Sequence, residues 1–570
     1  MSDQPAAPLS PDADRAARLG VALAMTLTLP AAIGAIGLAL RVPLTPLPLV
    51  AAAAVLGVWF WRDDRATAVR TLTGALVVIV ASSGVAAVLF DLSYDGQNYH
   101  QTGIRLLADG WNPVWDPARS ESVVSGQHVS GLPKGMWVLA AMVAQATGSI
   151  EAGKAMHLVA MTAAWLLAWP ALVVLGVDAR RARLMALVAA LSPVAVQQVA
   201  TYHVDGLVSS AFVAALALAV LWIRTGNRAW GVALAFEAAW LATLKFNAAA
   251  LALELAVAIA AWVAWRERAR LASALRFAAL ATVLALAQGI NPYITNIVRY
   301  GHPAYPLRGR GAILTAEMVQ SDPKFLTSPR VVQLAKSVFG ASSGDPEATP
   351  QLKLPFAVGV PEIAAFTNVD ARIGGWGPWF GGALLLGWIA LAIAWRLGDR
   401  TAPALAALSV AMLATAIVLP FGFYARYAPQ TWLAVLPSLA LVGIPRGLQR
   451  ALAAAALGNI AIVGAVAAAA GALDQALHRR QLSTLVHDAA GGAVSVAQDG
   501  HPFVNVDLHL SAYGIAHVNV DAPTCPRPAL LLRTHALLCL PGAKSPPPTP
   551  DPLDFVKPWL PASITLPVPR

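Results

Sequence analysis

The chain alternates between long apolar runs and short polar connections. Runs of about twenty apolar residues recur throughout the sequence, and a helix of that length crosses the hydrocarbon layer of a membrane. Because helices satisfy all of their backbone polar groups internally, the pattern predicts an all-α polytopic membrane protein. The predicted spans are residues 18–40, 45–61, 69–90, 152–176, 184–202, 206–223, 229–246, 248–265, 271–290, 377–395, 402–420, 428–445 and 451–472, about thirteen in all.

Basic residues in the short connections predict how these spans are oriented. Arginine clusters at 62–65, 180–183 and 266–270 fall between apolar runs, as is typical of cytoplasmic loops. This places the N-terminus in the cytoplasm and the C-terminus outside. Residues 135–148 are apolar but only fourteen residues long, so we expect a re-entrant or interfacial helix. A full crossing there would move the arginines at 180–183 to the outer side.

The same pattern divides the chain into three parts. Residues 1–16 are polar and rich in Pro, Ala and Asp, which predicts a disordered cytoplasmic tail. Residues 17–472 form the predicted membrane module, and its two long outer loops are residues 91–133 and 291–375. Residues 473–570 are then a small extracytoplasmic α/β domain that ends in a Pro-rich tail.

Short segments in the C-terminal part indicate strands. These segments are residues 503–510, 518–520 and 530–532, and the first of them alternates apolar and polar positions. The only two cysteines of the chain, Cys525 and Cys539, also lie in this part. Since disulfides form outside the cytoplasm, we expect these two residues to be bonded, although two buried thiols would fit the sequence as well.

Composition supports a membrane protein and argues against a nucleic-acid partner. The 570 residues are 57% hydrophobic and only 12% charged, with a mean hydropathy of +0.61. A soluble domain carries about 25% charged residues. The net charge of +10 comes largely from arginines in predicted inner loops, so the expected partners are membrane lipids and no nucleic acid.

Two carboxylates follow the predicted span 69–90, where the chain leaves the bilayer. Asp91 and Asp95 are followed by the hydrogen-bonding residues Asn98, Tyr99 and His100. Carboxylates beside lipid, backed by polar side chains, suit acid–base chemistry on a polar substrate. A solvated loop with tyrosines at the membrane interface would have the same composition.

The order of residues in this loop favours the chemical interpretation. The segment Tyr-Asp-Gly-Gln-Asn-Tyr-His at 94–100, followed by Gly-Trp-Asn-Pro at 110–113, resembles the first extracytoplasmic loop of the GT-C glycosyltransferases. The resemblance is to the branch with protein O-mannosyltransferases and the bacterial lipid A aminoarabinose transferase. An adjacent Asp-Glu pair seen in several members is absent here.

The resemblance implies a function and a location. It implies a multi-pass enzyme of the bacterial inner membrane that takes a sugar from a polyprenyl-phosphate donor. The acceptor would be a glycan, a lipid or a protein outside the cytoplasm, and the anomeric carbon would be inverted. Asp95 would be the general base, with Asp91 as the second choice, and Asn98, Tyr99 and His100 would orient the acid or the acceptor.

Other polar residues occur at the predicted outer ends of the spans. The topology places Asp205, Lys245, Asn291, Arg299, His302, Arg426 and Tyr427 on the same side as Asp95. Arg426-Tyr427 resembles an Arg-Tyr element of the same family, which implies that it faces the donor phosphate. Lys245 and Arg299 are further cations for that phosphate. Helix capping by Asp205 and snorkelling of Lys245 to the interface are simpler interpretations.

The predicted chemistry requires no cofactor, and other functions fit part of the pattern. No His/Cys cluster has the spacing of a zinc site, although Asp91, Asp95 and Asp205 leave a divalent cation open. A membrane transporter or lipid-linked sugar flippase is the main alternative, with Glu237 and Glu254 as intramembrane acids. A polysaccharide polymerase or ligase with a diphosphate-linked donor and a non-catalytic assembly subunit are the others.

Overall fold

The structure, a computed structural model, describes residues 9–61, 64–121, 123, 125–313, 322–345, 348–371, 373–498 and 504–549. Within these residues seven helices are long and apolar enough to cross a membrane. They are α1 (Pro11–Ala39), α3 (Arg65–Ala87), η2 with α8 (Glu151–Val174), α11 (Asp205–Thr225), α13 (Phe246–Arg266), η3 with α14 (Arg268–Gln288) and α23 (Arg446–Ala489). Shorter apolar helices are α2 (Leu47–Trp61), α7 (Gly135–Thr147), α19 (Phe380–Arg396) and α20 (Ala402–Val418). The helical, membrane-type architecture is confirmed, and the count of thirteen spans stays a prediction.

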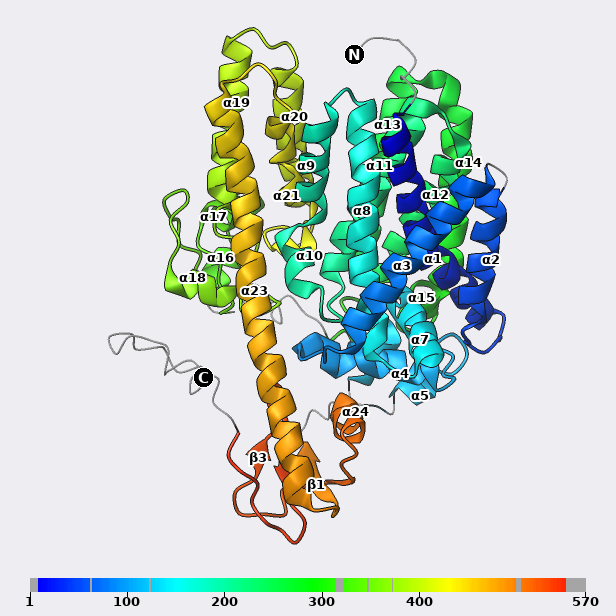
Figure 1. Ribbon diagram of the computed structural model, residues 1–570, viewed down its shortest axis with the longest axis vertical. Coiled ribbons are helices and arrows are strands. Elements are labelled where there is room, and N and C mark those ends of the chain that lie inside the picture. Colours follow the sequence, from blue (N-terminus) through cyan, green and yellow to red (C-terminus); the bar gives the residue numbers. More distant parts are fainter. Residues whose placement is uncertain are drawn as a thin grey trace.

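The long helices stand side by side (Figure 1). At the centre α8 packs against α1 and α11, with α12 (Arg228–Leu244), α13 and α14 on one flank and α19, α20 and α23 on the other. Small residues allow the close approach of the central helices. A Cβ on Gly20 of α1 would lie 2.8 Å from Cγ of Leu167 in α8, so a larger residue there would separate them.

Helix α1 begins earlier than the sequence pattern indicates. Its first residue is Pro11, and the Ser10 hydroxyl accepts a hydrogen bond from the Ala13 N–H at 3.4 Å. A Ser cap followed by Pro at the first helical position is a strong start signal. The prediction of disorder is therefore wrong for residues 11–16, and residues 1–8 of the predicted tail lie outside the described residues.

Two predicted spans are not continuous helices. In place of the span predicted at 184–202, the structure has two shorter helices, α9 (Ala179–Ala190) and α10 (Pro193–Gln198). In place of the span predicted at 428–445, it has α21 (Gln430–Leu433) and α22 (Leu436–Leu439). Both α10 and α22 have a proline in their first turn, which lacks the N–H that would continue a preceding helix. The apolar runs predicted burial correctly but not helix continuity.

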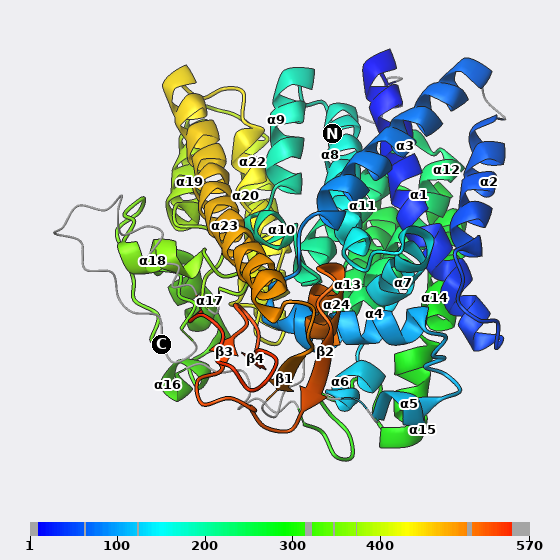
Figure 2. The ribbon, with the colours of Figure 1, turned by 60° about the horizontal axis from the view of Figure 1, so that its bottom comes forward.

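The two long predicted outer loops form a layer of short helices below the long ones (Figure 2). The first contains η1 (Gly96–His100), α4 (Gln101–Ala108), α5 (Pro117–Glu121) and α6 (Gly126–Gly131). The second contains η4 (Ile290–Ile294), α15 (Thr295–Tyr300), α16 (Pro323–Leu326), α17 (Arg330–Phe339) and α18 (Val360–Ala365). Helix α7 follows the first loop and packs against α1, α4 and η2.

Helix α23 connects the helical module to the C-terminal sheet. It runs unbroken for 44 residues, past the end predicted at residue 472. Its last turns contribute Leu482, Leu485 and Ala489 to the core of the sheet. The strand order is β2-β1-β4-β3, in which β1 (Val494–Gln498) is parallel to β2 (His517–Val520) and antiparallel to β4 (Ala536–Cys539). Strand β3 (Ala529–Leu530) pairs antiparallel with β4.

The strand predictions succeeded only in part. The strand at 518–520 is confirmed by β2, and of 530–532 only Leu530 belongs to a strand. The prediction at 503–510 is wrong, because its described part belongs to helix α24 (Val504–Ala512). There Val506 and Leu510 are both fully buried, and residues four apart share one face of a helix.

The predicted disulfide between Cys525 and Cys539 is confirmed. It joins strand β4 to the loop before β3, next to the short sheet. Residues 550–570 of the Pro-rich tail lie outside the described residues.

Candidate functional site

Asp91 is completely buried where α3 leads into the first outer loop. Its Oδ1 accepts hydrogen bonds from the Ser93 N–H (2.9 Å) and hydroxyl (2.6 Å), and its Oδ2 accepts one from the Tyr202 N–H (2.6 Å). Burial raises the pKa of this carboxyl, against the opposing effects of Lys154 and Ser93. A Cβ on Gly96 would lie 2.0 Å from Oδ2. Both oxygens are thus occupied by the protein itself.

Asp95 lies one residue before η1, a π-helical turn that continues into α4. Such turns re-aim side chains and are frequent at functional sites. The Asp95 side chain keeps 26% of its surface exposed, and its Oδ2 lies 3.8 Å from Nδ1 of His203. The sequence analysis did not single out His203, although it precedes Asp205 by two residues at the same outer end.

Basic side chains surround Asp95, and Arg426 and Lys245 are the cations among them. Burial opposes ionisation of the carboxyl, but His203, Arg426, His100 and Lys245 together lower its pKa below the ordinary value. These residues come from four segments that are far apart in the sequence. Asp95 is therefore ionised near neutral pH, inside a positively charged environment.

Asp205 and Lys245 form one half of that environment. Asp205 is the first residue of α11, and its carboxylate pairs with the ammonium group of Lys245 between α12 and α13. The N-cap position of α11 is Val204, so Asp205 lies in the first turn and its carboxylate pairs with Lys245. The ammonium nitrogen lies 4.5 Å from the centre of the Tyr427 ring, a cation–π distance.

Arg426 forms the other half. It lies in η6 (Ala425–Tyr427), where one guanidinium nitrogen pairs with Asp370 at 2.9 Å and another donates to the Tyr427 hydroxyl at 2.8 Å. Asp370 is the local carboxylate partner of Arg426, and the sequence analysis did not identify it. The sequence feature that could have identified Asp370 is its position as an acidic residue shortly before the predicted span at 377–395.

The neighbours of Asp95 in the loop have defined roles. Nδ1 of His100 accepts a hydrogen bond from the Trp137 indole at 2.7 Å, and burial lowers the pKa of His100 to about 3. The imidazole is therefore neutral with its proton on Nε2. Tyr99 stacks on His128 with ring centres 5.5 Å apart, and the Asn98 Oδ1 accepts from the Ser125 hydroxyl at 2.6 Å.

Three other predicted site residues form a separate group. The Asn291 amide donates to Pro113 O (3.0 Å), Arg299 donates to Val114 O (3.2 Å), and His302 Nδ1 accepts from the Ala304 N–H (3.0 Å). None of the three is among the groups that shift the pKa of Asp95. Asn291 and Arg299 join the second long loop to the first, whereas His302 bonds within its own loop. These contacts do not bring the three residues to the Asp95 cluster.

The C-terminal domain contacts the Asp95 loop directly. The Gln97 amide donates to Arg533 O at 2.8 Å and accepts from the Asn505 amide at 2.8 Å, while Tyr94 lies edge-on to His535. Gln475 of α23 also hydrogen-bonds both the N–H and the C=O of Phe90, at 3.0 and 2.6 Å. The loop on both sides of Asp95 is therefore held by the C-terminal part of the chain.

A buried ionic cluster lies behind this contact. The Glu151 carboxylate pairs with Lys154, accepts from the Gln101 amide at 3.0 Å and from the Asp91 N–H at 3.1 Å, and lies 3.7 Å from His509. It thus joins α8, the Asp91 turn and α24. The sequence analysis did not identify Glu151, which follows the short apolar segment at 135–148.

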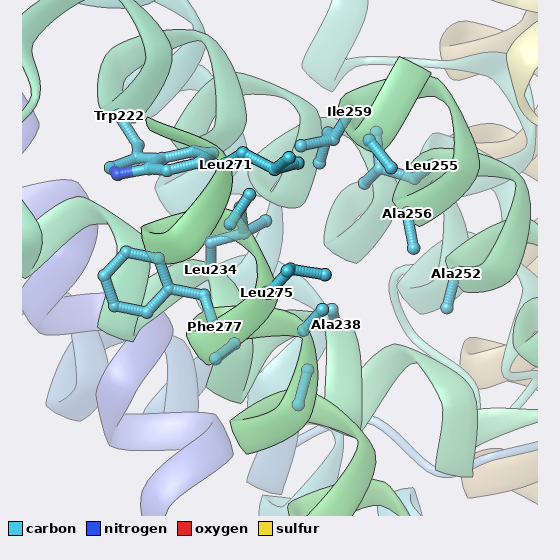
Figure 3. Close-up of a pocket in the computed structure, with 15 residues that line it drawn as sticks. Trp222, Leu234, Ala238, Ala252, Leu255, Ala256, Ile259, Leu271, Leu275 and Phe277 are labelled. Atoms are coloured by element: carbon cyan, nitrogen blue, oxygen red, sulfur yellow. The ribbon is translucent and has the colours of Figure 1, made fainter. Parts of the chain in front are cut away.

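An apolar hollow lies between α12, α13 and α14 (Figure 3). All of its lining side chains are apolar, among them Trp222, Leu255 and Phe277. Ala238 and Ala252 of its lining are each seven residues along the chain from Lys245, or about 10 Å along a helix. The nearest part of the hollow is therefore about two helical turns from Lys245.

Within the described residues, no group of three or more His, Cys, Asp or Glu side chains is arranged to hold a metal ion. No known protein family and no curated protein matches the chain in sequence. Any assignment of function therefore depends on the chemistry of the cluster itself.

Proposed function

We propose that this chain is a glycosyltransferase of the GT-C type in the bacterial inner membrane. In this proposal thirteen segments cross the bilayer, the N-terminus is cytoplasmic, and the Asp95 cluster and C-terminal domain are outside. The enzyme moves a sugar from a polyprenyl-phosphate donor to a glycan, lipid or protein acceptor.

The observation that carries the proposal is the position of one ionised carboxylate among fixed cations. Asp95 is partly exposed, whereas Asp205 is 2% exposed and paired with Lys245. Arg426 and Lys245 both lie beside the Tyr427 ring, 4.9 and 4.5 Å from its centre. A group that accepts a proton next to a group that binds an anion is what glycosyl transfer from a phosphate requires.

The reaction follows from these roles. The acceptor O–H or N–H gives its proton to Asp95 as its oxygen or nitrogen attacks the anomeric carbon from the face opposite the phosphate. The bond between that carbon and the phosphate oxygen breaks, and its electron pair stays on the leaving polyprenyl phosphate. Arg426 and Lys245 stabilise the charge that develops on the phosphate. Asp95 then releases its proton to water.

Binding of the donor would also make Asp95 a stronger base. In the free protein Arg426 and Lys245 contribute to the low pKa of Asp95, which weakens it as a proton acceptor. A phosphate anion placed between these cations compensates their charge, and the pKa of Asp95 rises as a result. Proton transfer is thus favoured only when donor is bound.

The apolar hollow supports the same assignment. A polyprenyl chain is entirely hydrocarbon, and the hollow offers an apolar surface that approaches Lys245 along α12 and α13. The donor would then place its chain in the membrane and its phosphate at the cluster.

Sugar transfer by the purified protein in lipid nanodiscs tests the proposal. A panel of polyprenyl-phosphate sugars is supplied to wild type, to Asp95→Asn and to the control Asp109→Asn, whose side chain is exposed and 3.7 Å from Arg105. We expect release of polyprenyl phosphate by wild type and control, and a loss of about 10²–10⁴-fold in Asp95→Asn. Equal rates in all three proteins would exclude Asp95 as the base.

One observation favours transport as a second function. Glu237 lies in the middle of α12 with 3% of its surface exposed, and its Oε2 has no hydrogen-bond partner among the described residues. Buried acids of this kind serve proton relays in transporters. Movement of a labelled lipid-linked sugar across proteoliposomes, abolished by Glu237→Gln and unaffected by Asp95→Asn, would support a transporter or flippase instead.

A further inference from the structure

The chain between α17 and α18 carries an exposed apolar pattern that the site does not use. In residues 352–360 every second side chain is apolar and exposed: Leu352 (68%), Leu354 (78%), Phe356 (39%), Val358 (41%) and Val360 (72%). The segment belongs to the α17 and α18 region on the left of the molecule in Figure 1, beside the middle of α23. Five large apolar side chains on one short loop are unusual at a water-facing surface.

The polar side chain within the loop points inward. Lys353 pairs with both carboxylate oxygens of Glu362, at 2.7 and 2.6 Å, and donates to Pro378 O at 2.6 Å. Its backbone N–H donates to Phe339 O at 3.2 Å. Because neighbouring side chains of an extended chain point to opposite sides, this anchor turns Leu352 and Leu354 outward.

Contacts with α19 indicate how far the 352–360 segment lies from the inner end of that helix, and therefore its depth in a membrane that α19 crosses. The Phe356 ring meets the edge of Trp379 with centres 6.0 Å apart, and a Cβ on Gly382 would lie 2.9 Å from that ring. Gly382 precedes Arg396, the inner end of α19, by fourteen residues, or about 21 Å of helix. The hydrocarbon layer is about 30 Å thick, so Phe356 lies within its outer part if α19 crosses the membrane.

The apolar surface of the loop is continuous with that of the helices beside it. Leu385 and Ile389, which lie further along α19, are 38% and 47% exposed. A transmembrane helix exposes such side chains to lipid. The same lipid would therefore meet the outward side chains of the loop.

We propose that the 352–360 loop inserts into the outer leaflet of the bilayer, with lipid acyl chains as the partner of its five apolar side chains. The backbone stays at the interface, where its exposed polar groups meet water and lipid headgroups, and the side chains enter the hydrocarbon. The loop thus anchors the second outer loop to the membrane. The inference rests on the proposed crossing of α19 and is independent of glycosyl transfer.

Single-cysteine labelling tests this insertion. The only two cysteines of the chain are bonded to each other, so a cysteine introduced elsewhere is the only site for a thiol-reactive NBD dye. Leu354→Cys and Val360→Cys report on the loop. Lys324→Cys, at an exposed position of α16 in the same outer loop, is the control.

The labelled full-length proteins are placed in nanodiscs with or without brominated phospholipids and are also titrated with aqueous iodide. For labels at 354 and 360 we expect emission to fall about twofold with brominated lipid and iodide quenching to be weak, whereas the label at 324 should respond only to iodide. Iodide quenching equal to that of the control at either position would overturn insertion. Protection from both quenchers would indicate a protein partner and would overturn the lipid assignment as well. Neither result depends on enzymatic activity, so the test is separate from that of the proposed function.

Discussion

Two carboxylates four residues apart in the same loop have opposite environments. Asp91 is fully buried and accepts three hydrogen bonds, two of them from backbone N–H groups. Asp95 is 26% exposed, and its Oδ2 lies 3.8 Å from Nδ1 of His203. The pKa of Asp91 is raised by burial, while that of Asp95 is lowered because nearby positive groups outweigh burial.

The comparison separates a structural acid from a chemically available one. The Asp91 oxygens are committed to Ser93 and Tyr202, so a substrate could reach them only by breaking buried hydrogen bonds. Asp95 lies just before η1 and keeps 26% of its side-chain surface exposed, so a substrate can reach it without breaking buried hydrogen bonds. We therefore keep Asp95 as the proposed base and assign Asp91 to the stability of the fold.

The largest difference between variants of Asp91 and Asp95 is expected in the free energy of unfolding. In Asp91→Asn one amide hydrogen would face the N–H of Ser93 or Tyr202, and a buried donor would lose its acceptor. We expect a loss of about 2–4 kcal/mol in the free energy of unfolding. The measurement is thermal unfolding in detergent, followed by tryptophan fluorescence. Asp95→Asn is the matched comparison: it removes ionic interactions of a partly exposed group and leaves the buried N–H groups of Ser93 and Tyr202 paired, so its Tm should fall less than that of Asp91→Asn. Equal losses of Tm in the two variants would show that both acids are structural.

The charges around Asp95 predict a dependence on pH. Because its pKa is lowered in the free folded protein, the ionised form persists as pH falls, and kcat/KM, which reports the free enzyme, is lost only below the ordinary pKa of Asp, about 3.9. Arg426→Gln removes one of the cations responsible, so the acidic limb of the pH–rate profile should move to higher pH. Transfer at neutral pH should also fall by at least about tenfold, since the phosphate loses a partner.

The control for this profile is Arg299→Gln, in the separate outer-loop group. We expect its acidic limb to coincide with that of wild type, because Arg299 is not among the groups that shift the pKa of Asp95. The double variant Arg426→Gln/Asp370→Asn removes the carboxylate that would otherwise lose its partner. If the acidic limb is the same in wild type, Arg426→Gln, Arg299→Gln and the double variant, Arg426 does not lower the pKa of Asp95.

The smallest effect is expected at the contact with the C-terminal domain. Asn505→Ala removes the hydrogen bond to Gln97, which is worth about 1 kcal/mol. Hydrogen exchange of the amides in residues 88–97 should then become about fivefold faster. Asn519→Ala, on strand β2 of the same domain, is the control and should leave this exchange unchanged. Unchanged exchange in Asn505→Ala would show that other contacts alone hold the loop.

Local pattern predicted much of the architecture. Runs of apolar residues correctly indicated buried or lipid-facing helices, because burial of apolar surface depends mainly on composition over one element. The disulfide was predictable because the chain has only two cysteines. The failures are elements such as α24, where the alternation of Val504 to Leu510 indicated a strand but the packing of Val506 and Leu510 favours a helix.

The candidate site was predicted as a set of residues and not as an arrangement. Positions at the outer ends of helices identified Asp95, Lys245 and Arg426, since the alternation of inner and outer loops can be counted along the chain. His203 and Asp370 were missed because their partners are more than fifty residues away in the sequence, as is the Asp91 N–H that donates to Glu151. The separation of Arg299 from Asp95 likewise depends on which loop each one contacts.

By itself, the sequence determined that this chain forms apolar helices, closes a disulfide and carries acids and cations at the outer ends of predicted spans. Hydrophobicity, helix length and charge act over one element and its neighbours, so they can be assessed before folding is known. Only the tertiary structure decided that Asp91 is occupied and Asp95 is available. That difference arises from hydrogen bonds and charges contributed by Tyr202, His203 and Arg426, which only folding brings to the loop.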